Sequence, residues 1–425
     1  MTENRRLRLV FVEPNGSGGL IHYAYQLCTA LADEGLEVIL VTGKEYELAH
    51  LPHNFQVNNF LDLWSLFDTQ ASQSVQANAW QRRWHKVRWT ARRGGRAFRL
   101  LSAWVSLTRH LTELKPDIVQ FSRIHFPFEA IFLGQMRRRG LMLTQICHEF
   151  EMREQQRGLF SSLAVRAYAD IYRNFSAIFF HARENCNKFL SLYPLVQNQR
   201  THIIPHGNSG WLLKHFPQDH DGDALRRRYG LKPGQPLVLF FGLLAPSKGL
   251  QDLVEAFALV RRVSDAKLLI AGYPTKHFDM GELGQKIAEL KLADDVVLDT
   301  RYIPLEEIGA LMGLATVAVY PYRSSTQSGA LQVAYTFGRP VIATYVGGLP
   351  EAVEHGRSGF LVPANSPGEL AEGILKLVTN RQLAKVMGEY ARHLSETRFS
   401  WKSVARKIVK VYDELLSKES QSTAG

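Results

Sequence analysis

The chain has 425 residues, of which 45% are apolar and 21% are charged. This composition excludes a disordered, collagenous or coiled-coil protein, and the length fits two domains of about 200 residues each. Lys and Arg outnumber Asp and Glu by 51 to 40, which gives a net charge of +11. Such a charge is compatible with nucleic acid, an anionic membrane surface or a phosphorylated substrate as a partner.

The cysteines and the apolar runs indicate the compartment. Cys28, Cys147 and Cys186 are scattered and form no CxxC pair, so we expect no disulfide framework and no zinc site. The apolar run near the N-terminus is too short for a signal-peptide core, and no stretch approaches the ~18 apolar residues of a spanning helix. The sequence therefore predicts a cytoplasmic protein, with any membrane contact peripheral and at the inner face.

The first half of the chain opens as strand, glycine turn, helix and strand. The apolar run Leu7–Val12 is followed by the turn EPNGSGG, a helix-period segment at 20–35 and a second strand at 37–42. Continuous apolar strands of this kind are typical of a parallel sheet that helices cover on both faces. Further strands are predicted at 117–121, 143–147, 177–181 and 202–205.

The second half of the chain repeats the pattern. A strand at 236–242 precedes a loop and a helix, and later strands are predicted at 267–272, 296–299, 317–322 and 340–344. Strands that alternate with helices twice over predict an α/β fold of two doubly wound, Rossmann-like domains. We place the N-terminal domain at 1–212, the C-terminal domain at 213–395 and a last helical segment with a frayed polar tail at 396–425.

A basic insert at about 69–112 stands apart from this pattern. It contains no Asp or Glu, and Trp80, Trp84 and Val87 follow helical spacing, which indicates an amphipathic basic helix broken at Gly94-Gly95. One interpretation is a solvated basic face whose tryptophans pack on the core; another is an interfacial membrane helix that places Arg on anionic lipid. Nucleic acid is disfavoured because no known binding motif accompanies the charge. The residues proposed for the acceptor or membrane are Trp80, Arg82, Arg83, Trp84, Arg92 and Arg93.

Two segments of the second half are suited to binding phosphate. Lys248 lies between a buried strand and the following helix, where a doubly wound domain can bind an anion. Downstream, a polar turn opens a helix at about Ser328, so the free backbone N–H groups of Ser328, Gly329 and Ala330 would form an anion cradle. Glu351 follows a glycine pair and either binds ligand hydroxyls or starts the next helix. Together these groups suit a diphosphate.

The order and spacing of these motifs resemble the retaining, nucleotide-sugar-dependent glycosyltransferases of family 4, which have the GT-B fold. The matching pieces include NGSGG, HEFE, IIPHGN, FGLLAPSKG, YPYRSSTQSGALQVAYTFGRPVIAT and VGGLPEAVEHGRSGFLVP. The resemblance implies two Rossmann-like domains that face each other across a cleft, with the nucleotide sugar on the C-terminal domain and the acceptor on the N-terminal domain. It also implies that the last helix crosses back to the N-terminal domain.

The chain departs from the family pattern at two places. Typical members carry an arginine shortly before the lysine, where this chain has Leu243 or Ala245, and a pair of glutamates where it has Ser325 and Val333. A subgroup that resembles this chain uses Thr-Gln-Ser-Gly, which includes Gln327, in place of the first glutamate. We predict that Arg323, in the same loop, supplies the missing second cation.

These residues define an expected mechanism. Lys248 and the amides of the Ser328 turn would stabilise the departing diphosphate without a metal ion or another cofactor. The Gly18-Gly19 turn would let the backbone of the first domain approach the donor. His148 would contact the sugar or acceptor, or else be a structural histidine, and Glu149 and Glu151 are alternative bases. His206 is expected to be structural, and the role of His181 is open.

The expected function is transfer of a sugar from a nucleotide-diphosphate sugar to a saccharide or lipid-linked acceptor, in polysaccharide or glycolipid biosynthesis. Expected partners are thus the nucleotide sugar, that acceptor and an anionic membrane surface, and not nucleic acid. Two alternatives stay open because one fold serves several chemistries. These are a nucleotide-sugar epimerase of GT-B shape and a degenerate binding protein without catalysis.

Overall fold

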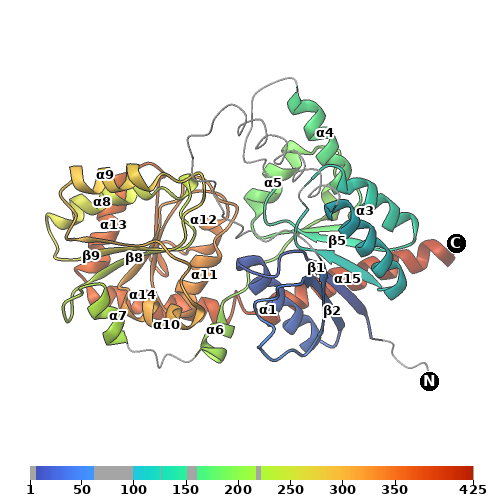
Figure 1. Cartoon of the computed structure of the whole chain (residues 1–425), viewed down its shortest axis with the longest axis horizontal. Coiled ribbons are helices and arrows are strands. Elements are labelled where there is room, and N and C mark those ends of the chain that lie inside the picture. Colours follow the sequence, from blue (N-terminus) through green and yellow to red (C-terminus); the bar gives the residue numbers. More distant parts are fainter. Residues whose placement is uncertain (1–5, 62–98, 125, 151–159, 217–221, 425) are drawn as a thin grey trace, which may run out of the picture. The chain divides into compact units, whose positions relative to one another are not determined.

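The computed structural model describes residues 6–61, 99–124, 126–150, 160–216 and 222–424. Contacts within the chain divide it into two units. The first comprises Met1–Phe180, Asn187–Ile203 and Ala405–Gly425, and the second comprises His181–Cys186 and Ile204–Val404. Each unit is an α/β domain built on a parallel sheet (Figure 1). The prediction of two doubly wound domains is therefore confirmed.

Seven parallel strands form the sheet of the first unit within the described residues, in the order β3-β2-β1-β4-β5-β6-β7. Residues Leu9 to Val12 are fully buried, as expected for a strand covered on both faces. The strand order reverses between β1 and β4, which is where ligands bind in doubly wound sheets. The strands are β1 (Arg8–Glu13), β2 (Glu37–Gly43), β3 (Gln56–Leu61), β4 (Ile118–Phe121), β5 (Leu143–Ile146), β6 (Ala177–Phe180) and β7 (Thr201–Ile203), and the helices include α1 (Gly19–Asp33), α3 (Glu129–Arg138) and α4 (Phe160–Tyr172). Helix α5 (Arg183–Leu192) begins in the second unit, up to Cys186, and continues in the first.

Six parallel strands form the sheet of the second unit within the described residues, in the order β10-β9-β8-β11-β12-β13. Its order reverses between β8 and β11. Figure 1 shows α8, α9 and α13 on one side of this sheet and α10 and α14 on the other. The strands are β8 (Leu237–Phe241), β9 (Lys267–Ala271), β10 (Val296–Asp299), β11 (Val317–Tyr320), β12 (Val341–Thr344) and β13 (Gly359–Val362). The helices are α6 (Gly210–His215), α7 (Gly222–Arg228), α8 (Leu250–Arg261), α9 (Met280–Glu289), α10 (Leu305–Leu314), α11 (Gly329–Thr336), α12 (Leu349–Ala352), α13 (Pro367–Val378) and α14 (Arg381–Glu396).

The segment after Ile204 packs in the second unit, although the sequence places the domain boundary after residue 212. The backbone N–H of Asn208 donates to Phe399 O at 2.8 Å, and the N–H of Ser209 donates to Thr336 Oγ1 at 3.0 Å. The Trp401 indole donates to Asn208 O at 2.8 Å. These bonds join the segment to α11 and to the chain that follows α14.

The last helix, α15 (Trp401–Ala424), belongs to the first unit from Ala405 onwards. Its Tyr412 is fully buried and donates its hydroxyl to Gln120 Oε1 of β4 at 2.8 Å. Arg406 pairs with Glu34 at the end of α1, at 3.1 Å. The helix also includes most of the tail for which fraying is predicted, because none of the residues Gln421 to Ala424 interrupts a helix.

Only the end of the basic insert falls on described residues. Residues 99–114 are helical, and Trp104 on this helix is buried. Its indole donates to Glu129 Oε1 at 3.2 Å and its ring stacks on Phe121 and Phe132. Trp104 is therefore a core residue. The residues proposed for the acceptor or membrane, Trp80, Arg82, Arg83, Trp84, Arg92 and Arg93, lie outside the described residues.

Candidate functional site

The loops after β8 and β11 meet where the strand order of the second sheet reverses. The N–H of Arg323, in the second loop, donates to Ser247 O in the first at 2.8 Å. Gly249 ends the first loop with φ +66°, and a Cβ at this position would lie 1.9 Å from Pro321 O. Only glycine fits this close approach in this conformation. The two loops are thus locked together by backbone contacts.

Lys248 lies on the locked loops, in the 3₁₀ turn Pro246–Lys248. Its ammonium is 3.7 Å from the centroid of the Tyr322 ring, a cation–π contact. The Tyr322 hydroxyl lies 3.1 Å from Ser328 Oγ, and burial raises the pKa of Tyr322 to about 12, so this hydroxyl keeps its proton at neutral pH. Lys248, Tyr322 and Ser328 therefore form a row that joins the lysine to the start of α11.

Helix α11 begins at Gly329, where the sequence predicts a helix start. Ser328 is the N-cap, and its Oγ accepts a hydrogen bond from the N–H of Leu331 at 3.2 Å. The N–H groups of Gly329 and Ala330 belong to the first helical turn, which offers them no acceptor within the helix. They carry the partial positive charge of the helix N-terminus. The predicted residues Ser328, Gly329 and Ala330 are thus linked to Lys248 through Tyr322, and Ser328 acts as the helix cap.

Arg323 is held by an acidic residue that the sequence analysis did not single out. Its Nε and Nη2 donate to the two carboxylate oxygens of Asp252 at 2.9 and 2.7 Å. Asp252 is buried in the first turn of α8, and its hydrogen bonds raise the pKa of Arg323. The Arg323 side chain remains 42% exposed. The carboxylate offsets the charge of the guanidinium, so the role of Arg323 as a second cation stays a prediction.

The loop that carries Gln327 is supported from two sides. Thr326 O accepts the N–H of Gly348 at 3.0 Å, and it also accepts the side-chain amide of Asn185. Ser325 Oγ donates to Gln327 O at 2.7 Å. The Gln327 side-chain oxygen is buried and has no hydrogen-bond partner among the described residues. It is therefore available to accept a hydrogen bond from a ligand hydroxyl.

Two further residues lie close to this loop. Glu351, on α12, accepts the N–H of Glu184 at 3.1 Å, at the start of α5. In this structure its carboxylate caps a helix, and its predicted contact with ligand hydroxyls stays a prediction. His206 lies with its ring edge against Gly329, where an added Cβ would be 3.7 Å from Cε1. Its Nδ1 donates to Gly207 O at 2.8 Å, and burial lowers its pKa to about 4, so the ring is neutral at physiological pH.

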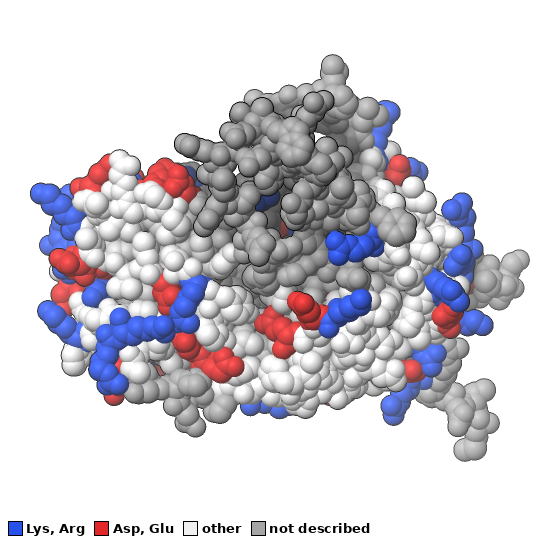
Figure 2. All heavy atoms as spheres, viewed as in Figure 1, with Lys and Arg blue, Asp and Glu red and all other residues white. Residues whose placement is uncertain are grey.

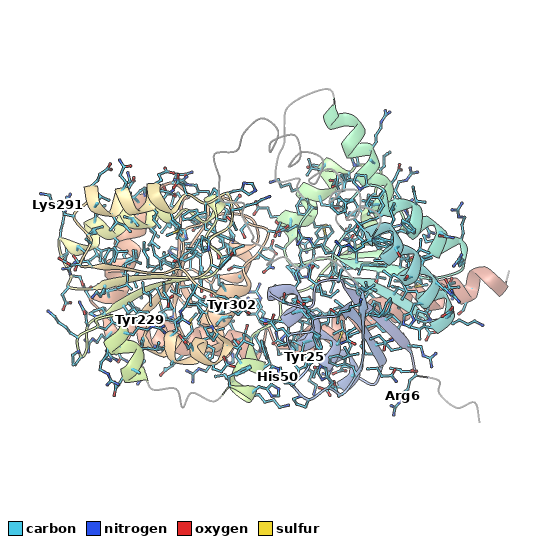
Figure 3. The ribbon with its side chains drawn as sticks, in the orientation of Figure 1. Arg6, Tyr25, His50, Tyr229, Lys291 and Tyr302 are labelled. Carbon is cyan, nitrogen blue, oxygen red and sulfur yellow. The ribbon has the colours of Figure 1, made fainter. Side chains whose placement is uncertain are left out.

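An exposed tyrosine lies at the same edge of the second sheet. Tyr302 follows β10, is 44% exposed and is labelled in Figure 3. The neighbouring Arg301 pairs with Asp299 at 3.0 Å and also with Glu307, while the Tyr229 hydroxyl donates to Asp299 at 2.8 Å. This network fixes the segment that presents Tyr302.

The predicted glycine turn lies in the first unit, after β1. Gly18 has φ +87° and is the N-cap of α1, which begins at the exposed Gly19. Its N–H donates to Glu47 Oε2 at 2.8 Å, and Glu47 Oε1 lies 2.7 Å from His22 Nε2. Position 18 favours glycine because its φ is positive, and the Glu47 carboxylate holds the turn in place.

His148 follows β5 in the same unit and is buried. Its ring packs edge-on against Tyr23 of α1, with 4.7 Å between the ring centroids. Glu149 pairs with Arg123 at 3.5 Å, whereas Glu151 lies outside the described residues. The roles of His148 and of either glutamate in catalysis stay predictions.

Two features of the described residues concern metal binding and surface charge. Within the ranges that the structure covers, no group of three or more His, Cys, Asp or Glu is placed to hold a metal ion. Figure 2 shows Lys and Arg interspersed with Asp and Glu on the described part of the face in view. The prediction that the reaction needs no metal ion remains a prediction.

Solved structures with a similar fold match almost the whole chain. Sucrose-phosphate synthase from Thermosynechococcus elongatus has a TM-score of 0.71 at 20% identity, over 97% of this chain and 100% of that chain. Anabaena HepE in complex with UDP and glucose has a TM-score of 0.69 at 18% identity, over 96% of this chain and 100% of that chain. These likenesses, with the two doubly wound sheets, confirm the predicted GT-B fold.

Curated relatives match about half of the chain. Alpha-D-kanosaminyltransferase from Streptomyces kanamyceticus is 30% identical over 203 residues, which cover 47% of this chain and 51% of that protein. D-inositol 3-phosphate glycosyltransferase from Corynebacterium jeikeium is 33% identical over 207 residues, which cover 46% and 48%. The chain therefore spans about half the length of the curated relatives it matches.

Family comparisons cover both units of the chain. Residues 17–208 match the family described as Glycosyltransferase Family 4. Residues 235–380 match the family described as Glycosyl transferases group 1. The two units thus match different glycosyltransferase families, residues 17–208 the one described as Glycosyltransferase Family 4 and residues 235–380 the one described as Glycosyl transferases group 1, on the GT-B fold.

Proposed function

We propose that the protein is a retaining glycosyltransferase that moves a sugar from a nucleotide-diphosphate sugar to a saccharide or lipid-linked acceptor. The observation that carries the proposal is the row of Lys248, Tyr322 and Ser328, which joins a cation to the open N-terminus of α11. Structures of the similarly folded HepE with UDP and with UDP-glucose support a nucleotide sugar as the donor.

Transfer with retention requires the bond between sugar and phosphate to loosen while the acceptor hydroxyl approaches the same face of the sugar. Negative charge then develops on the departing diphosphate. Lys248 and the amides of Gly329 and Ala330 would stabilise that charge, because they are fixed before the reaction begins. Gln327 would accept a hydrogen bond from a donor hydroxyl, and Arg323 would add a second, partly offset positive charge.

Arg323→Ala should weaken donor binding about tenfold, because a hydrogen bond to a charged group contributes roughly 1.5 kcal/mol or more. Asp252→Asn is the matched control, since it keeps the shape of the partner and removes the charge that offsets Arg323. Donor affinity measured by calorimetry should fall in the first variant and should not fall in the second. Unchanged affinity and turnover in Arg323→Ala would refute the role of Arg323.

The proposed acceptor is a saccharide or a lipid-linked saccharide at the inner membrane face, in polysaccharide or glycolipid biosynthesis. The basic, tryptophan-rich insert at 69–112 supports this proposal, because Arg binds anionic lipid and Trp favours the headgroup region. Among the described residues, no helix combines the length and apolar character needed to cross a bilayer. We propose peripheral membrane contact because of the Arg and Trp residues of the insert.

Replacing Arg82, Arg83, Arg92 and Arg93 by Ser should lower the fraction of protein that sediments with acidic lipid vesicles, since each Arg near such a surface contributes about 1 kcal/mol. Binding of the original protein should also weaken as salt is added, because salt screens the charges. Equal sedimentation of both proteins would contradict membrane contact through the insert.

The proposed activity can be tested with a panel of nucleotide sugars and detection by mass spectrometry. We expect donor hydrolysis or transfer for one class of donor, and its loss in a Lys248 variant. A degenerate binding protein would bind a nucleotide sugar without turnover. Tight binding with no turnover of any donor, in the presence of saccharide acceptors, would favour that alternative.

A further inference from the structure

Glu13 is a fully buried acid at a place in the first sheet where ligands bind in doubly wound folds. It is the last residue of β1, beside the point where the strand order reverses between β1 and β4. The glycine loop, defined here as residues 14–19, follows it directly. None of the roles proposed above uses this carboxyl group.

The contacts of Glu13 join the glycine loop to β4. Its Oε1 accepts the backbone N–H of Asn15 at 2.9 Å, and its Oε2 is hydrogen-bonded to Ser122 Oγ, which follows β4. Ser122 Oγ also lies 3.1 Å from Val12 O. A hydroxyl can donate or accept, so Ser122 serves both states of the acid. It accepts from a protonated Glu13 while donating to Val12 O, or it donates to an ionised Glu13.

A second acid holds the same loop in a different environment. Glu47 accepts the N–H of Gly18 at 2.8 Å and donates its own N–H to Gly16 O at 2.9 Å. Glu47 pairs with His22 at 2.7 Å, whereas Glu13 has no ion pair among the described residues. A buried carboxylate without an ion pair is costly, so burial favours the protonated form. Burial raises the pKa of Glu13 to about 7, although both hydrogen bonds and the charge of Arg123 lower it.

We propose that Glu13 is a positioning residue, whose protonated carboxyl group holds the glycine loop in its ligand-binding shape through Asn15. Ionisation creates a buried charge, which the chain can hydrate only by loosening the loop that covers it. The same charge would repel an anionic ligand near the loop. The part that concerns donor binding rests on the proposed function, but the behaviour of the loop does not.

Several other charged or titratable groups face this region, and their effects on the pH dependence must be distinguished from that of Glu13. Arg123 follows Ser122 and is paired with Glu149. Lys44, Glu45, Tyr46 and Glu47 lie on the segment after β2 that packs against the loop, and His22 lies on α1. The pair of His22 and Glu47 is also within hydrogen-bond reach of Gly18. A variant of Glu13 itself is therefore needed to assign any effect of pH.

Glu13→Gln is that variant, because its amide has the shape of a protonated carboxyl group. Its oxygen can accept from Asn15, and its NH₂ can donate to Ser122. Glu37→Gln is the matched control. It removes the same charge from β2 at the opposite end of the strand pair, where Glu37 pairs with Arg8 at 3.0 Å.

Hydrogen–deuterium exchange of the backbone amides of residues 15–19 should be measured from pH 6 to pH 9 in all three proteins. At each pH the intrinsic rate of amide exchange in this segment is the same for the three proteins. A difference in exchange between them therefore reflects a difference in how well the loop protects its amides. We expect equal protection of the original protein and Glu13→Gln at pH 6. Above pH 7 the original protein should lose protection, approaching tenfold per pH unit, while Glu13→Gln keeps it and Glu37→Gln follows the original. Equal protection at every pH, or loss of protection in Glu13→Gln at pH 6, would overturn the proposal.

An infrared titration of the original protein covers the case in which Glu13→Gln does not fold. The C=O band of a buried protonated carboxylic acid should disappear between pH 6 and pH 9, and its absence at pH 6 would overturn the proposal. The KM for a nucleotide sugar should rise over the same range in the original protein and stay flat in Glu13→Gln. A pH-dependent loop with flat KM values in both would overturn the role in donor binding. Absence of turnover would count against the proposed function and leave the exchange result standing.

Discussion

Lys248→Met is expected to lower kcat for sugar transfer by about 10²–10³-fold, the usual effect of removing one preorganised group that stabilises developing charge. Methionine keeps an unbranched apolar stem over the Tyr322 ring, so packing at the Lys248 position is preserved while the positive charge is lost. Steady-state kinetics with a saturating nucleotide sugar would measure the loss.

Lys267→Met is the control for this prediction. Lys267 begins β9, at the opposite edge of the sheet from Lys248, and donates to Gly230 O at 3.0 Å. This variant changes the net charge by the same amount and should leave kcat unchanged. Equal kinetics for the Lys248 and Lys267 variants would show that the lysine at the locked loops has no part in the reaction.

Gly249→Ala is expected to disrupt the same site through the backbone. The new Cβ would lie 1.9 Å from Pro321 O, and the left-handed conformation at φ +66° costs a non-glycine residue roughly 1–2 kcal/mol. The loops after β8 and β11 must then separate, which moves Lys248 away from Tyr322 and the start of α11. We expect a loss of donor turnover close to that of Lys248→Met, together with a lower free energy of unfolding.

Gly284→Ala is the matched glycine control. Gly284 lies in α9, and an added Cβ would meet nothing within 4 Å. Alanine favours a helix by up to about 1 kcal/mol over glycine, so this variant should be as stable as the original protein or more stable. Chemical denaturation and donor turnover would compare the two glycines. A Gly249 variant with the stability and turnover of the Gly284 variant would contradict the locked-loop geometry.

Most strands could be predicted because a buried strand is a continuous run of apolar residues, which is visible in the local sequence. The strand at Val296–Asp299 has the predicted bounds, and the other predicted strands differ by one or two residues at an end. β3 (Gln56–Leu61) was not predicted, because this edge strand is rich in Asn and Gln and lacks an apolar run. β13 (Gly359–Val362) is short and lies within a motif that was interpreted for its ligand contacts.

The motifs of the proposed donor site could be found in the sequence, but the contacts between distant residues could not. Lys248 and Ser328 each follow a buried strand of a parallel sheet, and the carboxyl ends of such strands meet at one edge. The pairing of Arg323 with Asp252 depends on which carboxylate the fold brings near, and these residues are far apart in the sequence. The contact of His206 with Gly329 depends on packing in the same way.

The sequence shows the position of Glu13 but not its environment. It is an acid at the end of an apolar strand and directly before a glycine turn, and the predicted strand stopped at Val12. Its burial is a property of the packed unit, because Ser122, its hydrogen-bond partner, comes from the segment after β4. The position was therefore visible in the sequence, whereas the protonation state was not.

A crystal structure of the protein with UDP or GDP tests the central claim most directly. The account predicts the diphosphate at the locked loops of the second unit, with Lys248 Nζ and the N–H groups of Gly329 and Ala330 within hydrogen-bond distance of phosphate oxygens. A nucleotide bound elsewhere, or a Lys248 ammonium turned away from the phosphates, would contradict it.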